Sequence, residues 1–132
     1  MKRYFFFDID GTLTTPLTAD YPDSAREAVR RLQEKGNFVA IASGRLQADA
    51  VDVAEELGID SVISDGGNGV TCCGKILYHE GLPLEDCFRL LGEIDGKKHP
   101  WAVTTENKKR RKTKYDDYLK RVTCLLYTSP SP

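Results

Sequence analysis

The sequence predicts an α/β fold built on a parallel sheet, because short apolar runs alternate with segments of helical periodicity through its first half. Strand, helix, strand, helix and strand follow one another between residues 4 and 64. This order is typical of a parallel sheet whose strands are joined by right-handed crossovers. At Asp65 the glycine-rich run DGGNGV interrupts the alternation, and we expect a second, α+β unit beyond it.

The expected elements of the first region are strand 4–9, helix 24–36, strand 38–42, helix 43–58 and strand 61–64. The first strand consists mostly of aromatic residues, which indicates that it is buried. In the first helix, Ser24 and Glu27 have the spacing of a capping box, and Gly36 stands where a helix should end. Gly58 ends the second helix in the same way.

The second region predicts shorter elements. They are a hairpin over 70–78 with a type II′ turn at Gly74-Lys75, a helix around 84–91, a strand near Trp101 followed by a charged loop, and a short helix over 115–122. We therefore divide the chain into a core region of residues 1–67, a second region of residues 68–123 and an unstructured tail of residues 124–132. Pro130 and Pro132 exclude a helix or a central strand in that tail.

The composition indicates a protein that acts away from membranes and nucleic acids. The net charge is −1, so no overall field attracts nucleic acid or an anionic lipid surface. The apolar run at the N-terminus is too short for a signal peptide and is interrupted by Asp8, so we expect a cytoplasmic protein. No run approaches the roughly 18 apolar residues needed to span a bilayer.

The cysteines and the basic residues have simple interpretations. The four cysteines show no C-x-x-C spacing, which argues against zinc and for reduced, mostly buried thiols. The basic run NKKRRKTK is read as a solvated loop. A nucleic-acid patch is the alternative, but no aromatic residues are interleaved with the charges.

Two carboxylates, Asp8 and Asp10, end the first strand. In an open parallel sheet, ligands bind at the carboxyl ends of the strands. Residues two apart in an extended segment project to the same side, so the two charges repel unless a cation neutralises them. Mg²⁺ prefers oxygen ligands and is often held by one or two carboxylates. A metal site is therefore weighed against a solvated strand end.

The next two strands end in polar loops at the same edge of the sheet. Ser43-Gly44-Arg45 precedes a helix, where a hydroxyl and free backbone N–H groups suit a phosphate oxygen. For Ser43 the alternative is a plain helix N-cap, and for Arg45 it is a surface salt bridge. The third strand ends in Asp65-Gly66-Gly67. Carboxylates, a hydroxyl and exposed amides together favour metal-assisted phosphoryl transfer.

The segment DIDGT, residues 8–12, resembles the D-x-D-G-T signature of the haloacid dehalogenase-like (HAD) phosphatases. Ser43 in IASGR resembles their second motif, and SDGGNGV with GKILY is similar to the Cof-type subgroup, which carries an α/β cap after the third core strand. The resemblance is good over residues 3–80 and looser beyond. It implies a partial Rossmann-like parallel sheet with helices on both faces, plus an incomplete α+β cap.

The resemblance also implies roles for the matching residues. Asp8 would be the nucleophile that accepts the phosphoryl group, and Asp10 the general acid and then the general base. Mg²⁺ would be held by Asp8 and by Asp10 through its backbone carbonyl. The phosphoryl oxygens would be bound by Gly11, Thr12, Ser43 and Gly44, and the substrate pocket would be lined by Arg45, Asp65, Gly66, Gly67 and Asn68.

Two later motifs of the family are absent from the sequence, namely a lysine that stabilises the aspartyl-phosphate and a G-D-x-x-N-D acidic pair. The pair Asp116-Asp117 lies in KYDDYLK, a helical context without glycine. We therefore expect a chain that ends inside the cap and has little or no activity by itself. The tail LLYTSPSP resembles translated adapter sequence, and the first strand is expected to lack a neighbour on one side.

The expected function is Mg²⁺-dependent hydrolysis of small phosphorylated metabolites, such as sugar phosphates, through an aspartyl-phosphate. A phosphomutase of the same family is the nearest alternative, and a non-catalytic module that binds phosphate or Mg²⁺ is the second. A receiver domain also clusters aspartates at strand ends, but it would not explain D-x-D-G-T together with IASGR. The sequence specifies neither the substrate nor the oligomeric state.

Overall fold

The computed structural model describes residues 1–15, 20–108 and 111–115 of the chain. Its contacts divide the chain into two compact units, the first running Met1–Glu80 and the second beginning at Gly81. The predicted helix over 115–122 lies, apart from Tyr115, outside the described residues, and so does the predicted tail 124–132. Within the described residues, no helix is long and apolar enough to cross a membrane.

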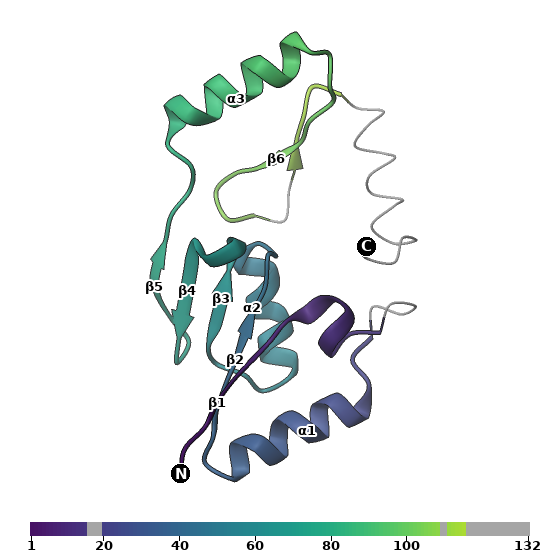
Figure 1. Ribbon diagram of the computed structural model, residues 1–132, viewed down its shortest axis with the longest axis vertical. Coiled ribbons are helices and arrows are strands. Elements are labelled where there is room, and N and C mark those ends of the chain that lie inside the picture. Colours follow the sequence, from purple (N-terminus) through teal and green to yellow (C-terminus); the bar gives the residue numbers. More distant parts are fainter. Residues whose placement is uncertain (16–19, 109–110, 116–132) are drawn as a thin grey trace. The chain divides into compact units, whose positions relative to one another are not determined.

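The first unit is a five-stranded sheet accompanied by two long helices (Figure 1). Its elements are β1 (Tyr4–Phe7), α1 (Asp23–Glu34), β2 (Phe38–Ala42), α2 (Gln47–Glu56), β3 (Val62–Ser64), β4 (Gly69–Cys72) and β5 (Lys75–His79). The strands lie side by side in chain order. β1, β2 and β3 are parallel, as predicted, and β4 and β5 are antiparallel to their neighbours.

The register of β1 places its end beside the end of β2. Tyr4 lies opposite Phe38 and Phe7 lies opposite Ile41. The strand ends at Phe7 rather than at the predicted Ile9, because a tight turn takes over at Ile9. In the described sheet β1 is an outer strand with β2 as its neighbour, which agrees with the expectation that one of its sides lacks a partner.

The ends of the two helices agree with the sequence prediction better than their beginnings. Gly36 and Gly58 follow α1 and α2 with positive φ values of 77° and 69°. Only glycine adopts this backbone conformation at low cost, so both residues end their helices as predicted. The capping box is wrong, because α1 begins after Pro22 without a side-chain cap and Glu27 instead binds the guanidinium groups of nearby arginines.

One hydrophobic core lies under the sheet and holds both helices. Phe5 and Phe7 of β1 pack against it, whereas Tyr4 and Phe6, on the opposite face, are 65% and 54% exposed. The helix cover predicted for both faces is therefore seen on one face of the described sheet. The buried cluster consists of Ile9, Leu13, Val29, Val39, Ile41, Ala50, Val53, Ala54, Leu57, Ile59 and Val62.

The β4–β5 hairpin extends this same sheet, since β4 pairs with β3 from Ser64 opposite Gly69 onward. The boundary between the compact units accordingly falls after Glu80, later than the division after residue 67 that the sequence suggested. The predicted turn at Gly74-Lys75 is wrong. The turn is formed by Cys73 and Gly74, whose φ values of 50° and 73° are both positive, as in a type I′ turn.

The described residues of the second unit form α3 (Leu84–Gly96), β6 (Val103–Thr104) and β7 (Arg111–Lys112). β6 and β7 form an antiparallel pair, so a section of the predicted charged loop is a strand. Asp95 on α3 accepts hydrogen bonds from Trp101 Nε1 at 2.7 Å and from Tyr115 Oη at 2.9 Å. Over the described ranges of this unit, 81–108 and 111–115, no residue is buried.

Candidate active site

The site begins in the turn that follows β1. Ile9 is fully buried, while its neighbours Asp8 and Asp10 are exposed, so the alternation predicted for the two carboxylates is present. Gly11 has a φ of 79°, which lets the chain reverse here. Thr14 stabilises the turn, because its hydroxyl donates to the Ile9 carbonyl at 3.0 Å and accepts the Gly11 N–H at 3.3 Å.

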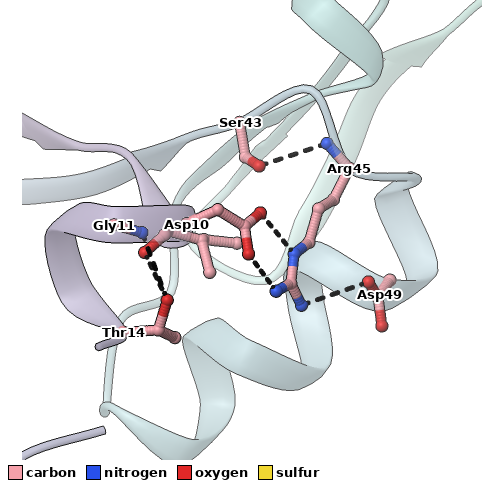
Figure 2. Close-up of polar contacts among 7 residues, drawn as sticks. Asp10, Gly11, Thr14, Ser43, Arg45 and Asp49 are labelled. Carbon is pink, nitrogen blue, oxygen red and sulfur yellow. Dashed lines mark hydrogen bonds and ion pairs between the residues drawn. The ribbon is translucent and has the colours of Figure 1, made fainter. Parts of the chain in front are cut away.

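The two carboxylates differ in their surroundings. Asp8 makes no hydrogen bond or ion pair with any other residue in the ranges 1–15, 20–108 and 111–115. Asp10 is bound by the guanidinium of Arg45, whose Nε donates to Oδ2 at 2.9 Å and whose Nη2 donates to Oδ1 at 2.5 Å (Figure 2). Of the two carboxylates, Asp8 is therefore the one that no described residue of the chain occupies.

Arg45 comes from the loop after β2 and binds two carboxylates at once. Besides Asp10, it contacts Asp49 of α2 through Nη1 at 3.3 Å. Figure 2 shows the guanidinium between the two acids. Asp49 was not predicted, although its position four residues after Arg45 is a spacing that brings side chains together on a helix.

The ion pair between Arg45 and Asp10 changes the acidity of the Asp10 carboxyl. The hydrogen bonds from Arg45 lower the pKa of the Asp10 carboxyl below its usual value of 3.8, partial burial opposes this shift, and the positive charge of Arg45 adds to it. The same contact raises the pKa of Arg45. Both groups are thus charged at neutral pH in this arrangement.

Ser43 lies at the end of β2, where the sheet register places it next to the β1 turn. Its side chain is buried, and its Oγ accepts the backbone N–H of Arg45 at 3.1 Å. Leu46 is the N-cap of α2, so the alternative that Ser43 caps the helix is wrong. Because Oγ acts as an acceptor here, its O–H remains able to donate to a ligand. Gly44 and Thr12 are exposed.

The loop after β3 is tied directly to the loop after β2. The Asp65 N–H donates to the Arg45 carbonyl at 2.8 Å, and the Gly66 N–H donates to the Ser43 carbonyl at 3.3 Å. The three polar strand ends that the sequence singled out therefore meet at one edge of the sheet. The contacts fix the backbone of the predicted phosphate-binding loop from the side of β3.

Asp65 contacts the beginning of α2. Its Oδ2 accepts the backbone N–H of Gln47, the first residue of α2, at 3.0 Å and lies 3.1 Å from His79 Nε2. A carboxylate at a helix N-terminus is favourable because it satisfies a free N–H and complements the helix dipole. Gln47 and His79 were not predicted, since their meeting with Asp65 depends on the β3–β4–β5 register.

The remaining predicted pocket residues lie in the same connection. The Gly67 carbonyl accepts the Tyr78 hydroxyl at 2.8 Å, and the Asn68 carbonyl accepts the N–H of Glu80 at 2.8 Å. Gly69 is required for close approach, because a Cβ there would lie 2.3 Å from Ser64 Oγ. Residues 65–68 are thus held between α2 and the hairpin.

The donor set is compatible with a hydrated Mg²⁺. Asp8 offers a carboxylate without a protein partner among the described residues, and Mg²⁺ commonly takes one or two carboxylates and keeps several waters. Asp10 would supply its backbone carbonyl oxygen as a ligand for Mg²⁺, since its carboxylate is bound by Arg45. In the described residues, no group of three or more His, Cys, Asp or Glu side chains is arranged to hold a metal.

Comparison with known proteins agrees with this arrangement of fold and site. The family described as "haloacid dehalogenase-like hydrolase" matches residues 5–122. The chain belongs to this family of hydrolases.

Among curated relatives, the chain is 39% identical over 106 residues to "Putative phosphatase YkrA" of Bacillus subtilis, which covers 80% of this chain and 41% of YkrA. It is 30% identical over 86 residues to a "Putative phosphatase" of Haemophilus influenzae, covering 63% of this chain and 31% of the relative. The chain thus spans less than half the length of both relatives.

Solved structures show the same fold. A hypothetical protein from Geobacillus kaustophilus matches the whole chain and 51% of its own length, with a TM-score of 0.80 and 33% identity. The sugar phosphatase BT4131, of HAD subclass IIB, matches 92% of this chain and 48% of its own, with a TM-score of 0.75 and 25% identity. The α/β core predicted from the sequence is therefore the core of HAD hydrolases.

Proposed function

We propose that the protein encoded by this reading frame is a Mg²⁺-dependent phosphatase acting in the cytoplasm on small phosphorylated metabolites, such as sugar phosphates. The observation that carries the proposal is the parallel register of β1 and β2, which ends both strands at the same edge of the sheet, with Asp8 following β1 and the Ser43 loop following β2. Asp8 has no partner among the described residues. The relatives named as phosphatases and the sugar phosphatase BT4131 support the same class of substrate.

Catalysis is proposed to pass through an aspartyl-phosphate. An Asp8 oxygen attacks phosphorus, the bond between phosphorus and the alcohol oxygen breaks, and Asp10 gives a proton to the departing alcohol. Asp10 then takes a proton from a water molecule, which attacks the phosphorus of the intermediate and releases phosphate. Asp8 returns to its carboxylate form.

The buried loops hold the phosphoryl group in this scheme. The Ser43 hydroxyl and the backbone N–H groups of Gly44 and Thr12 donate to its oxygens, which carry increased charge in the transition state. Gly11, whose own N–H binds Thr14, lets the backbone turn close to the phosphoryl group. Because the contacts of Asp65 and Gly66 fix the Ser43 loop, little reorganisation is needed at the moment of reaction. A Mg²⁺ bound at Asp8 and the Asp10 carbonyl would neutralise the approaching negative charges.

The Arg45 contact bears on the acid step. A general acid must carry a proton, but Arg45 holds Asp10 in its charged form. A substrate phosphate competes for the same guanidinium, because Arg binds phosphate and carboxylate with the same two-pronged geometry. We infer that Arg45 turns from Asp10 to the substrate on binding, which frees Asp10 to take up a proton. This is the role proposed for Arg45 in the substrate pocket.

The test measures hydrolysis of p-nitrophenyl phosphate, in the presence of Mg²⁺, by the protein translated from the full reading frame that encodes this chain. Asp8→Asn removes the nucleophile but keeps the shape of the side chain, so turnover should fall by more than about 10³-fold. Asp23→Asn, at an exposed carboxylate in the first turn of α1, is the matched control and should keep normal turnover. Unchanged turnover in Asp8→Asn would exclude Asp8 as the nucleophile and leave a binding module as the alternative.

The chain of 132 residues taken alone is expected to be a poor catalyst, because the sequence contains neither the family's later lysine nor its acidic pair. Each missing electrostatic contributor of this kind costs about 10²–10³ in rate. Measurement of p-nitrophenol release by the isolated chain beside the full reading frame checks this expectation. Equal rates would mean that the residues of this chain are sufficient.

A further inference from the structure

Two adjacent thiols stand at the tip of the β4–β5 hairpin, away from the candidate active site. Cys72 is the last residue of β4, and Cys73 is the first residue of the turn. Their Sγ atoms lie 3.8 Å apart. Cys73 is exposed, Cys72 is half-buried, and both are free thiols. The prediction of mostly buried thiols is thus wrong for this pair.

The turn is what brings the two side chains together. Neighbouring residues in a regular strand point to opposite faces of the sheet, which would separate the two sulfurs. The φ of 50° at Cys73 breaks that alternation. Contacts with the start of β3 hold the turn in place, since Cys73 N–H donates to Ser61 Oγ at 3.3 Å and Gly74 N–H donates to the Asp60 carbonyl at 2.8 Å.

The same geometry works against a disulfide between the two residues. Adjacent Cα atoms are about 3.8 Å apart across a trans peptide, which is shorter than the roughly 4.4–6.8 Å of ordinary disulfides. The Cys72 thiol also raises the pKa of Cys73 through its hydrogen bond and its charge, and Asp60 raises it further. The backbone geometry therefore favours two reduced thiols, and the raised pKa favours the protonated form of Cys73.

The sulfur spacing suits a bridging atom. Two sulfurs bound at about 2.3 Å to one centre lie about 3.4–3.5 Å apart in a pyramidal arrangement and about 3.8 Å apart in a tetrahedral one. The separation of Cys72 and Cys73 is therefore within a few tenths of an ångström of the distance that a bridging atom requires. A full zinc site needs four ligands, and the described residues offer no group of three or more His, Cys, Asp or Glu here. A suitable ligand is therefore a soft centre that needs two sulfurs and brings its own third substituent.

We propose that Cys72 and Cys73 form a dithiol site for soft thiophilic metalloids, with trivalent organoarsenicals as the chemical class. In the binding step, an arsenic oxide R–As=O condenses with the two thiols. Two As–S bonds replace the two S–H bonds, and the oxygen leaves as water with both thiol protons. Neither sulfur nor arsenic changes oxidation state, so no oxidant or reductant is required.

The site is separate from the proposed phosphatase chemistry. β4 runs from Gly69, beside Ser64 at the active-site edge, to Cys72 at the opposite edge of the sheet. Evidence against the dithiol site would therefore leave the proposed phosphatase activity unaffected, and the reverse also holds.

The test uses the full 132-residue chain, phenylarsine oxide as the probe and intact-mass measurement in the presence of increasing glutathione. Wild type should retain one arsenical, because closure of the second As–S bond is intramolecular. Cys72→Ser and Cys73→Ser should each lose the adduct to glutathione. Cys87→Ser, which removes a cysteine outside the pair, should behave like wild type.

A comparison with the peptide TCCGK, residues 71–75, separates a built site from two cysteines that are merely adjacent in sequence. Because the fold holds the sulfurs near the bridging distance, the folded chain should resist glutathione at about tenfold higher concentration than the peptide. Equal resistance of chain and peptide would overturn the proposal. Loss of the adduct in Cys87→Ser, or its retention in Cys73→Ser, would overturn it as well.

Discussion

The first unit has a dry core beneath its functional edge, whereas the described residues of the second unit have none. Val29 of α1 and Ile41 of β2 are 1% and 0% exposed. On α3 of the second unit, Leu84 and Phe88 are 74% and 71% exposed. Burial of apolar surface is the main source of folding free energy, so we expect the described residues of the first unit to contribute more to stability than those of the second.

This difference in burial indicates which unit can hold reactive side chains in fixed positions. Ile9 is inserted into the core between Asp8 and Asp10, and this fixes both carboxylates relative to the sheet. Among the described residues of the second unit, polar contacts gather around Asp95, such as the ion pair with Lys114 at 2.5 Å. Exposed ion pairs contribute little, typically about 0–1 kcal/mol. The residues proposed to act on phosphate accordingly all lie in the first unit.

The largest expected effect is on the core. Ile41→Ala removes a fully buried side chain and should lower the free energy of unfolding of the first unit by about 2–5 kcal/mol. Leu84→Ala removes a side chain of similar size from an exposed position on α3 and should change the free energy of unfolding of the second unit by less than about 0.5 kcal/mol. Urea unfolding followed by far-UV circular dichroism measures both. Equal losses would mean that α3 is as well packed as the sheet.

Replacement of a glycine by alanine should have effects of opposite sign on stability at Gly58 and at Gly92. Gly58→Ala forces a side chain into a positive φ of 69° at the end of α2, which should cost about 1–2 kcal/mol. Gly92 lies within α3 with open space around it, so Gly92→Ala should stabilise the helix by about 0.5–1 kcal/mol. Amide hydrogen exchange, read separately over α2 and α3, gives both values. Slower exchange over α2 in Gly58→Ala would contradict the assignment.

Two carboxylates allow a finer comparison of the units. Arg45 lowers the pKa of Asp10, and Lys114, Trp101 and Tyr115 lower the pKa of Asp95, in each case chiefly by hydrogen bonding. A depressed carboxyl pKa contributes stability above the unfolded pKa, and this stability is lost as the pH falls through the folded value. The contribution of both pairs should therefore begin to fall at about pH 4 and disappear once the pH is below the lowered folded pKa values.

Carbon-detected NMR titration of the two carboxyls measures this directly. Arg45→Gln should raise the pKa of Asp10 toward 3.8, and Lys114→Gln should raise that of Asp95. The first shift should be larger, because the side chain of Arg45 is 29% exposed and that of Lys114 is 55% exposed. A pKa of Asp10 that does not respond to Arg45→Gln would mean that the pair in Figure 2 does not persist in solution.

The sequence was sufficient for features that depend on local pattern. The three parallel strands follow from apolar runs, and Gly36 and Gly58 mark the helix ends because few other residues tolerate positive φ. The convergence of Asp8, Ser43 and Asp65 at one edge also followed, since parallel strands end on the same side.

Features that depend on long-range register were missed. The Asp10–Arg45 pair joins residues 35 positions apart and exists because β1 lies next to β2. The contact of Asp65 with His79 requires three strands in register. The hairpin turn was placed one residue late because Cys73 carries a positive φ that its residue type does not favour. Tertiary contacts to Ser61 and Asp60 hold that conformation.

The central claim is that the Asp8 carboxylate carries the phosphoryl group during turnover. Asp10→Asn in the protein translated from the full reading frame should slow hydrolysis of the intermediate, because Asp10 is the proposed base that activates water. After reaction with p-nitrophenyl phosphate and an acid quench, peptide mass spectrometry locates the phosphoryl group. The account predicts phosphorylation at Asp8 in Asp10→Asn and none in the Asp8→Asn, Asp10→Asn double variant. A phosphoryl group on any other residue, or in the double variant, would contradict it.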